Sequence, residues 1–195
     1  MLGAMETPTK KKKSYRGVIT IAIIFIILFA YSFGSNIMRT GSCSLDLIGK
    51  GDPAPIFSLP GVTEKDVTFD PKGKVTVLNF WMTSCGPCRK ELPSLMSMNK
   101  KLMEKKNFQM VTVACDPEDT EDKLRKQVET LFAHLNVEVP ALIDYKQEVS
   151  SQYGVFKFPE TFIIDKNGIV RAKFAGAREF GNIEYIRMIE EMLSE

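Results

Sequence analysis

Two cysteines separated by two residues, in "FWMTSCGPCRKELP" (residues 80–93), constrain this chain more than any other feature. They follow "VTVLNFW" (75–81), an apolar run rich in β-branched residues, with the length of a strand buried on both faces. The residues after the pair predict a helix from about Cys85 to Lys106. The first cysteine is therefore expected where a buried strand leads into the N-terminus of a helix.

This position favours redox chemistry at the pair. Unpaired backbone N–H groups and the helix dipole stabilise an anion at a helix N-terminus, which lowers the pKa of the Cys85 thiol. The resulting thiolate is the form that attacks a disulfide. Cys88 lies one turn further on and can attack the mixed disulfide in turn. Pro87 fits the start of a helix, where its missing N–H costs little.

A metal site and a structural disulfide explain the pair less well. A structural zinc needs four ligands, but the chain offers only Cys43, Cys115 and one histidine, His134, which is expected on an exposed helix face. A disulfide across two residues closes a very small loop and restricts the unfolded chain little. We expect neither a metal nor a cofactor.

The surrounding pattern predicts one α/β domain over residues 49–195, with a central mixed sheet flanked by helices. An Asn-Gly turn at 166–168 indicates a hairpin. Asp116 or Thr120 is expected to cap the second helix. Strands are expected at 67–69, 75–81, 108–115, 161–165 and 169–174, and further helices at 116–136, 147–155 and 181–193.

A proline before the penultimate strand is a second candidate site element. Pro159 lies in "FKFPETF" (156–162), directly before that strand. A cis X-Pro bond is uncommon and tends to be retained for a reason. Here it would expose the backbone of Phe158 for pairing with an incoming peptide. The alternative is an ordinary trans proline at a strand edge.

The N-terminal region predicts a membrane anchor. Residues 1–16 carry five basic side chains and one acidic side chain, for a net charge of +4 in a chain whose total is +2. The rest of the chain is thus −2, which argues against a nucleic-acid partner. An uncharged, apolar run begins at Gly17, and we expect residues 17–38 to span the membrane. A signal peptide cleaved after Gly34 is the alternative.

Both alternatives predict the same topology. Residues 1–16 stay in the cytoplasm and the domain lies outside, in a single-pass protein of the inner membrane. Residues 39–48 form a tether, in which Cys43 is interpreted as incidental, with acylation as the alternative.

The combination of "NFWMTSCGPCRKELP" and "YGVFKFPETFIIDKNGIVRAKFAG" resembles the thioredoxin superfamily. Within it the chain is similar to the membrane-anchored TlpA/ResA-like branch, which includes the cytochrome c maturation thioredoxins. "GDPAPIFSL" resembles the entry segment of that branch, and the resemblance covers about residues 49–193. It implies a thioredoxin-like fold.

The resemblance also implies roles for individual residues. Cys85 would be the nucleophile, Cys88 the resolving thiol and Glu91 an acid that tunes the thiols. A substrate would be bound by Trp81, Pro87, Phe158 and the cis proline Pro159.

Three positions refine the resemblance. Glu160 matches the "PET" of the cytochrome maturation members. Ser84 stands where Trp is usual, and Asn79 replaces the buried acid of cytoplasmic thioredoxins. The proton-accepting role would then fall to Glu91.

We therefore expect a membrane-anchored, extracytoplasmic thiol–disulfide oxidoreductase. It would reduce partner disulfides, with apocytochrome c as the substrate the resemblance implies and a membrane thiol carrier as electron donor. A protein-disulfide oxidant or isomerase is one alternative. A Sco-like copper-delivery protein is another, although it would need a CxxxC pair and a well-placed histidine. A peroxiredoxin has its reactive cysteine in a Pro-x-x-x-Thr-x-x-Cys motif. This chain lacks that motif, because Thr83 lies only two residues before Cys85 and no proline precedes it.

Overall fold

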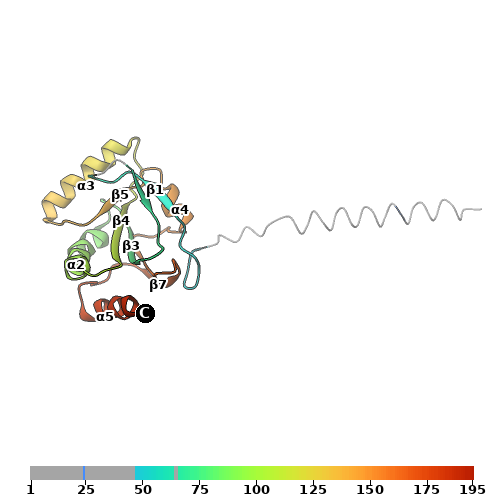
Figure 1. Ribbon diagram of the computed structural model, residues 1–195. Coiled ribbons are helices and arrows are strands. Elements are labelled where there is room, and N and C mark those ends of the chain that lie inside the picture. Colours follow the sequence, from blue (N-terminus) through green and yellow to red (C-terminus); the bar gives the residue numbers. More distant parts are fainter. Residues whose placement is uncertain (1–23, 25–46, 64–65) are drawn as a thin grey trace, which may run out of the picture. The chain divides into compact units, whose positions relative to one another are not determined.

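The computed structural model describes residues 24, 47–63 and 66–195, and its domain is an α/β fold (Figure 1). Its strands and helices alternate along most of the chain. The strands are β1 (Phe57–Leu59), β2 (Val67–Phe69), β3 (Val75–Trp81), β4 (Phe108–Ala114), β5 (Ala141–Ile143), β6 (Glu160–Ile164) and β7 (Val170–Ala175). The helices are α2 (Gly86–Leu102), α3 (Glu121–Leu135), α4 (Glu148–Gln152) and α5 (Ile183–Ser194).

A five-stranded mixed sheet forms the centre, in the order β5-β4-β3-β6-β7. β3 pairs in parallel with β4, and β4 with β5, whereas β6 runs antiparallel to both β3 and β7. β1 and β2 form a separate two-stranded sheet. The mixed sheet and the hairpin of β6 and β7 agree with the prediction from the sequence.

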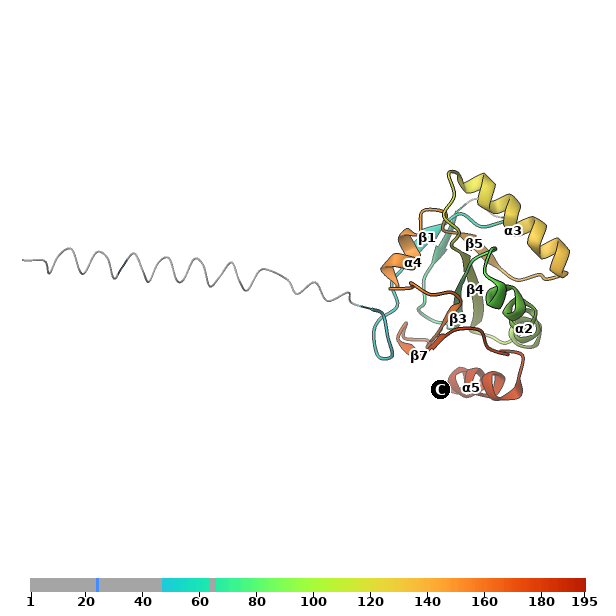
Figure 2. The same ribbon diagram turned by 180° about the vertical axis from the view of Figure 1, so that it is seen from behind.

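The central strand β3 separates two apolar layers, and all seven of its residues are buried. Val75, Val77 and Trp81 belong to the core beneath α2, α3 and α5. Leu78 and Phe80 belong to the core on the other face, together with α4 and the β1–β2 pair. Figures 1 and 2 show the same division from two sides, with α2 and α5 across the sheet from α4. Helices thus cover both faces, as expected.

Several boundaries differ from the prediction. α2 ends at Leu102 rather than near Lys106, and a turn closed by the Phe108 N–H and the Lys105 carbonyl leads into β4. α3 begins at Glu121 rather than at residue 116, because Thr120 is the residue whose side chain accepts from the Lys123 N–H. The short strands β1 and β5 were not predicted, since three residues carry too little pattern.

The expected anchor at 17–38, the tether at 39–48 and Cys43 lie outside the described residues, apart from Ile24 and the end of the tether. Within the described parts of the chain, no helix combines the length and hydropathy needed to cross a membrane.

Cys115 follows β4 and is fully buried. It packs in the layer with Leu78 and Phe80, whereas Cys88 packs in the layer on the other face of the sheet. Burial raises the pKa of the Cys115 thiol, and the neighbouring Asp144 carboxylate raises it further. The position fits a small apolar core residue better than a redox partner of the cysteine pair.

We expect Cys115 to stay reduced and unmodified in the folded protein. The sheet separates it from Cys85 and Cys88, and its raised pKa leaves little thiolate. Peroxide treatment of the native protein, alkylation and disulfide mapping by mass spectrometry should find Cys115 labelled only after unfolding. A disulfide between Cys115 and either residue of the pair would contradict this placement.

Candidate active site

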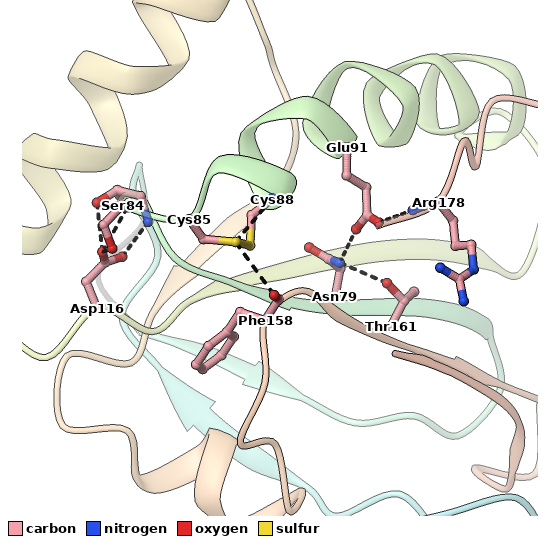
Figure 3. The surroundings of a disulfide bond; sticks show 10 residues. Asn79, Ser84, Cys85, Cys88, Glu91, Asp116, Phe158, Thr161 and Arg178 are labelled. Atoms are coloured by element: carbon pink, nitrogen blue, oxygen red, sulfur yellow. Dashed lines mark hydrogen bonds between the residues drawn. A yellow bond between two sulfur atoms is a disulfide. The ribbon is translucent and has the colours of Figure 1, made fainter. Parts of the chain in front are cut away.

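Cys85 and Cys88 form a disulfide at the junction of β3 and α2, with an S–S distance of 2.05 Å (Figure 3). Cys85 is the N-cap residue of α2, and its sulfur accepts a hydrogen bond of 3.2 Å from the Cys88 N–H. This places the first sulfur at the helix N-terminus, where an anion is stabilised. Cys85 is half-buried, whereas Cys88 is only 1% exposed. Pro87 is exposed in the first turn.

The segment before β6 lies against the disulfide. The Phe158–Pro159 peptide bond is cis, as the resemblance implies. The Phe158 carbonyl oxygen lies 3.7 Å from Cys85 Sγ (Figure 3). Among the described residues, neither the N–H nor the C=O of Phe158 bonds to another backbone group, while the Pro159 carbonyl accepts from the Gly176 N–H. The structure therefore brings Cys85, Cys88, Phe158 and Pro159 together, with one stretch of free backbone beside the sulfurs.

Trp81 does not lie on this surface. Its side chain is fully buried and stacks on Phe132 of α3, with ring centroids 5.6 Å apart. We expected Trp81 to bind substrate, and the structure corrects that expectation. Side chains alternate between the two faces of β3, and this alternation points Trp81 into the core beneath α2. A partner therefore cannot contact its indole.

Asp116 is the site residue that the sequence analysis missed. It follows β4, and its carboxylate lies beneath the loop that leads to Cys85 (Figure 3). It accepts hydrogen bonds from the Thr83 N–H at 2.7 Å and the Thr83 hydroxyl at 2.8 Å. The N–H and hydroxyl of Ser84 approach it at 3.3 Å. A buried carboxylate with four such contacts holds the loop in one conformation.

Of the two residues expected to cap the second helix, Thr120 is confirmed and Asp116 is not. Its carboxylate is engaged by Thr83 and Ser84, 33 and 32 residues earlier in the chain. One signal could have revealed this contact. Side chains that follow neighbouring parallel strands meet at the carboxyl edge of the sheet, and β3 and β4 are such neighbours.

Glu91 lies one turn beyond Cys88 on α2, and its carboxylate points toward the sheet and away from solvent (Figure 3). Oε1 accepts from Asn79 Nδ2 at 2.8 Å, and Oε2 accepts from the Arg178 N–H at 2.7 Å. Asn79 Nδ2 also donates to the Thr161 hydroxyl at 2.8 Å. The acid thus contacts β3 and the loop before α5, and none of these hydrogen bonds reaches a sulfur atom.

Burial is the main cause of the unusual pKa of Glu91. Its side chain is 1% exposed, and this desolvation raises the pKa from 4.5 to about 7. The hydrogen bonds from Arg178 and Asn79 and the charge of Arg178 act in the opposite direction. Near neutral pH the group therefore exchanges a proton readily, which suits a residue that tunes thiols.

Glu160 secures the strand that follows Pro159. Its carboxylate lies 3.3 Å from Lys173 Nζ on the neighbouring β7, and burial raises its pKa while the Lys173 charge lowers it. The same ammonium lies 4.9 Å from the centre of the Phe162 ring. In the described part of the chain, no three His, Cys, Asp or Glu side chains are grouped so as to hold a metal ion.

Comparison with known proteins identifies relatives of the same kind. The AhpC/TSA family model matches residues 50–173. The thioredoxin-like protein YneN of Bacillus subtilis is 35% identical over 150 residues, which cover 76% of this chain and 84% of YneN. The thiol-disulfide oxidoreductase ResA of Geobacillus thermodenitrificans is 31% identical over 85% of this chain and 90% of ResA.

A solved structure agrees with these matches. A Chlorobium tepidum protein assigned as the thiol:disulfide interchange protein DsbE superposes with a TM-score of 0.65 and 33% identity. The match covers 75% of this chain and 99% of that one. The fold around the cysteine pair is therefore shared with thiol–disulfide exchange proteins.

Replacing Glu91 with Gln should remove a pH dependence of stability. An acid whose pKa is higher in the fold than in the unfolded chain stabilises the fold fully below pH 4.5, and this contribution is lost as the pH rises through about 7. The wild type should lose on the order of 3 kcal/mol over that range relative to Glu91→Gln. Asn79 Oδ1, which has no hydrogen-bond partner among the described residues, can turn toward the new amide.

Urea denaturation of both proteins between pH 4 and pH 8 measures this difference. Glu129→Gln is the matched control, because Glu129 is exposed and forms no ion pair within the described residues. If the stabilities of Glu91→Gln and the wild type ran parallel across the range, the buried acid would not titrate there.

Replacing Asp116 with Asn should destabilise the protein by about 1–3 kcal/mol, because hydrogen bonds to a buried charged group are lost. Asp119→Asn is the control. It removes the same charge from the same connection, but Asp119 is almost fully exposed, and its one ion pair within the described residues is with Lys123, at 3.7 Å. Its effect should stay below about 0.5 kcal/mol. Equal effects in thermal or urea unfolding would show that Asp116 does not hold the loop.

Proposed function

Because this chain belongs to the AhpC/TSA family and is a thiol–disulfide oxidoreductase, we propose that it reduces disulfide bonds of partner proteins through Cys85 and Cys88. The observation that carries the proposal is the unequal exposure of the two cysteines. Cys85 is half-buried at the helix N-terminus, next to the free backbone of Phe158, and Cys88 is 1% exposed beneath it. A partner can reach the first sulfur and not the second.

The exchange proceeds in two steps from the reduced protein. The Cys85 thiolate attacks one sulfur of the partner disulfide, and the other partner sulfur leaves and takes up a proton. The Cys88 thiolate then attacks Cys85 Sγ, which releases the second partner thiol and forms the disulfide seen in the structure. The partner gains two electrons and two protons. A dithiol donor must return two electrons to the pair before the next turnover.

Glu91 and Phe158 support these steps in different ways. The proposed role of Glu91 is to accept the proton of the Cys88 thiol before the second step, since a carboxylate whose pKa is raised to about 7 can exchange a proton near neutral pH. The free N–H and C=O of Phe158 can pair with the partner backbone beside its disulfide, as in strand addition. Pro87 and Pro159 flank this contact.

Apocytochrome c is the proposed substrate, and a membrane thiol protein the proposed donor. Both rest on the similarity of "CGPCRKELP" and "FPET" to the cytochrome c maturation thioredoxins. The proposed location is outside the inner membrane, with residues 17–38 as a single anchor. It rests on the +4 charge of residues 1–16 and the apolar run that follows.

A trapping experiment tests the proposal. The full-length Cys88→Ser variant, incubated with apocytochrome c whose haem-binding cysteines form a disulfide, should accumulate a mixed disulfide on a non-reducing gel. Both variants also carry Cys43→Ser, and Cys85→Ser should then accumulate none, because its remaining cysteines, Cys88 and Cys115, are buried. The wild type should release free thiols on the partner at a rate at least a hundredfold above Cys85→Ser.

Two results would count against the proposal. Trapping by Cys85→Ser instead of Cys88→Ser would reverse the roles of the two cysteines. A reduction potential too high to reduce the partner would favour the oxidant or isomerase.

A further inference from the structure

A groove between α2 and α3 opens beside the cysteine pair. It has a volume of about 440 Å³ and none of the residues that line it is acidic. Thr83, two residues before Cys85, forms one end. The remaining wall is formed by Arg89 of α2 and by Lys123, Lys126, Gln127, Leu131 and other residues of α3. We call it the α2–α3 groove.

The end of the groove near the disulfide is held in place by hydrogen bonds. The Thr83 N–H and hydroxyl donate to the buried Asp116 carboxylate. Gln127 of α3 lies 3.5 Å from the Thr83 hydroxyl and donates to Glu118 at 2.6 Å. A ligand would therefore meet a wall that is already ordered, which lowers the entropy lost on binding.

The charge of the groove is positive and partly unpaired. Lys123 is neutralised by Glu118 at 2.6 Å and by Asp119 at 3.7 Å. Arg89 and Lys126 are exposed and form no ion pair within the described part of the chain. Two cations without an ion-pair partner in the described part of the chain thus line the groove together with the apolar Leu131.

We propose that the α2–α3 groove binds an acidic segment of the protein substrate, located beside the cysteine that reacts with Cys85. This proposal rests on the proposed function, because the segment is brought there by the disulfide under attack. The partner would contact the protein on two sides of Cys85, with its backbone at Phe158 and its carboxylates at Arg89 and Lys126. Complementary charge raises the association rate and selects among partners.

Two peptides test this inference with the full-length protein. Each has one cysteine in a disulfide with the same chromophoric thiol, and the residues flanking that cysteine are Glu in one peptide and Gln in the other. The measured quantity is the ratio of the rates at which the reduced protein releases the chromophore from the Glu and the Gln peptide. Arg89 is left unchanged, because it follows Cys88 directly and its charge acts on the thiols as well.

The variant is Lys126→Gln, and Lys74→Gln is the control. Lys74 is exposed and precedes β3, so it lies at the edge of the sheet opposite to the cysteine pair. We expect the Glu/Gln ratio to fall about threefold in Lys126→Gln and to stay unchanged in Lys74→Gln, a size typical of one exposed charge pair. Raising the salt to 1 M should lower the wild-type ratio by a similar factor.

The possible outcomes distinguish a failure of the groove proposal from a failure of the proposed function. If the Glu/Gln rate ratio were the same in the wild type and in both variants, the groove would not bind acidic segments. The proposed oxidoreductase activity would be unaffected by this result. If the ratio fell equally in Lys74→Gln and Lys126→Gln, the preference would come from the overall charge and the groove would again be excluded. If the wild type released the chromophore from neither peptide, the proposed function would fail, and this inference with it.

Discussion

The fold depends on the burial of β3 between two apolar layers. Each of its seven residues is inaccessible to water, and it pairs with β4 on one side and β6 on the other. Both elements of the site are attached to these strands. Cys85 follows β3 after a short loop, and Pro159 directly precedes β6. Because the two strands are antiparallel, the end of β3 and the start of β6 meet at one edge, which brings the sulfurs to the Phe158 carbonyl.

Buried polar side chains hold the site within this apolar frame. Asp116 fixes the loop before Cys85, and the carboxylate of Glu91 joins α2 to β3 through Asn79 and to the loop before α5 through Arg178. Burying such groups costs free energy, which their hydrogen bonds offset in part. For Glu91 the offset is incomplete, and its raised pKa reflects this. The site therefore combines a rigid loop with a proton that exchanges near neutral pH.

The two surfaces beside Cys85 have different roles in the proposed recognition of a partner. Phe158 offers free backbone, which any extended peptide can use irrespective of its sequence. The α2–α3 groove offers two cations that form no ion pair within the described residues, and these are proposed to distinguish one partner from another. The hydrogen bonds from Thr83 and Ser84 to Asp116 fix the position of the groove relative to Cys85.

The amino-acid sequence by itself determined the strand–cysteine–helix junction, the central mixed sheet and the place of Pro159, because these follow from local patterns: an apolar run, a CxxC pair and a proline before a strand. It could not place Trp81 or Asp116. The resemblance implied that Trp81 binds substrate, yet its side chain is fully buried and stacks on Phe132. Asp116 was one of two candidates for a helix cap, yet the parallel pairing of β3 and β4 brings it to Thr83, 33 residues away. Such contacts join segments distant in the chain, so only the tertiary structure could decide them.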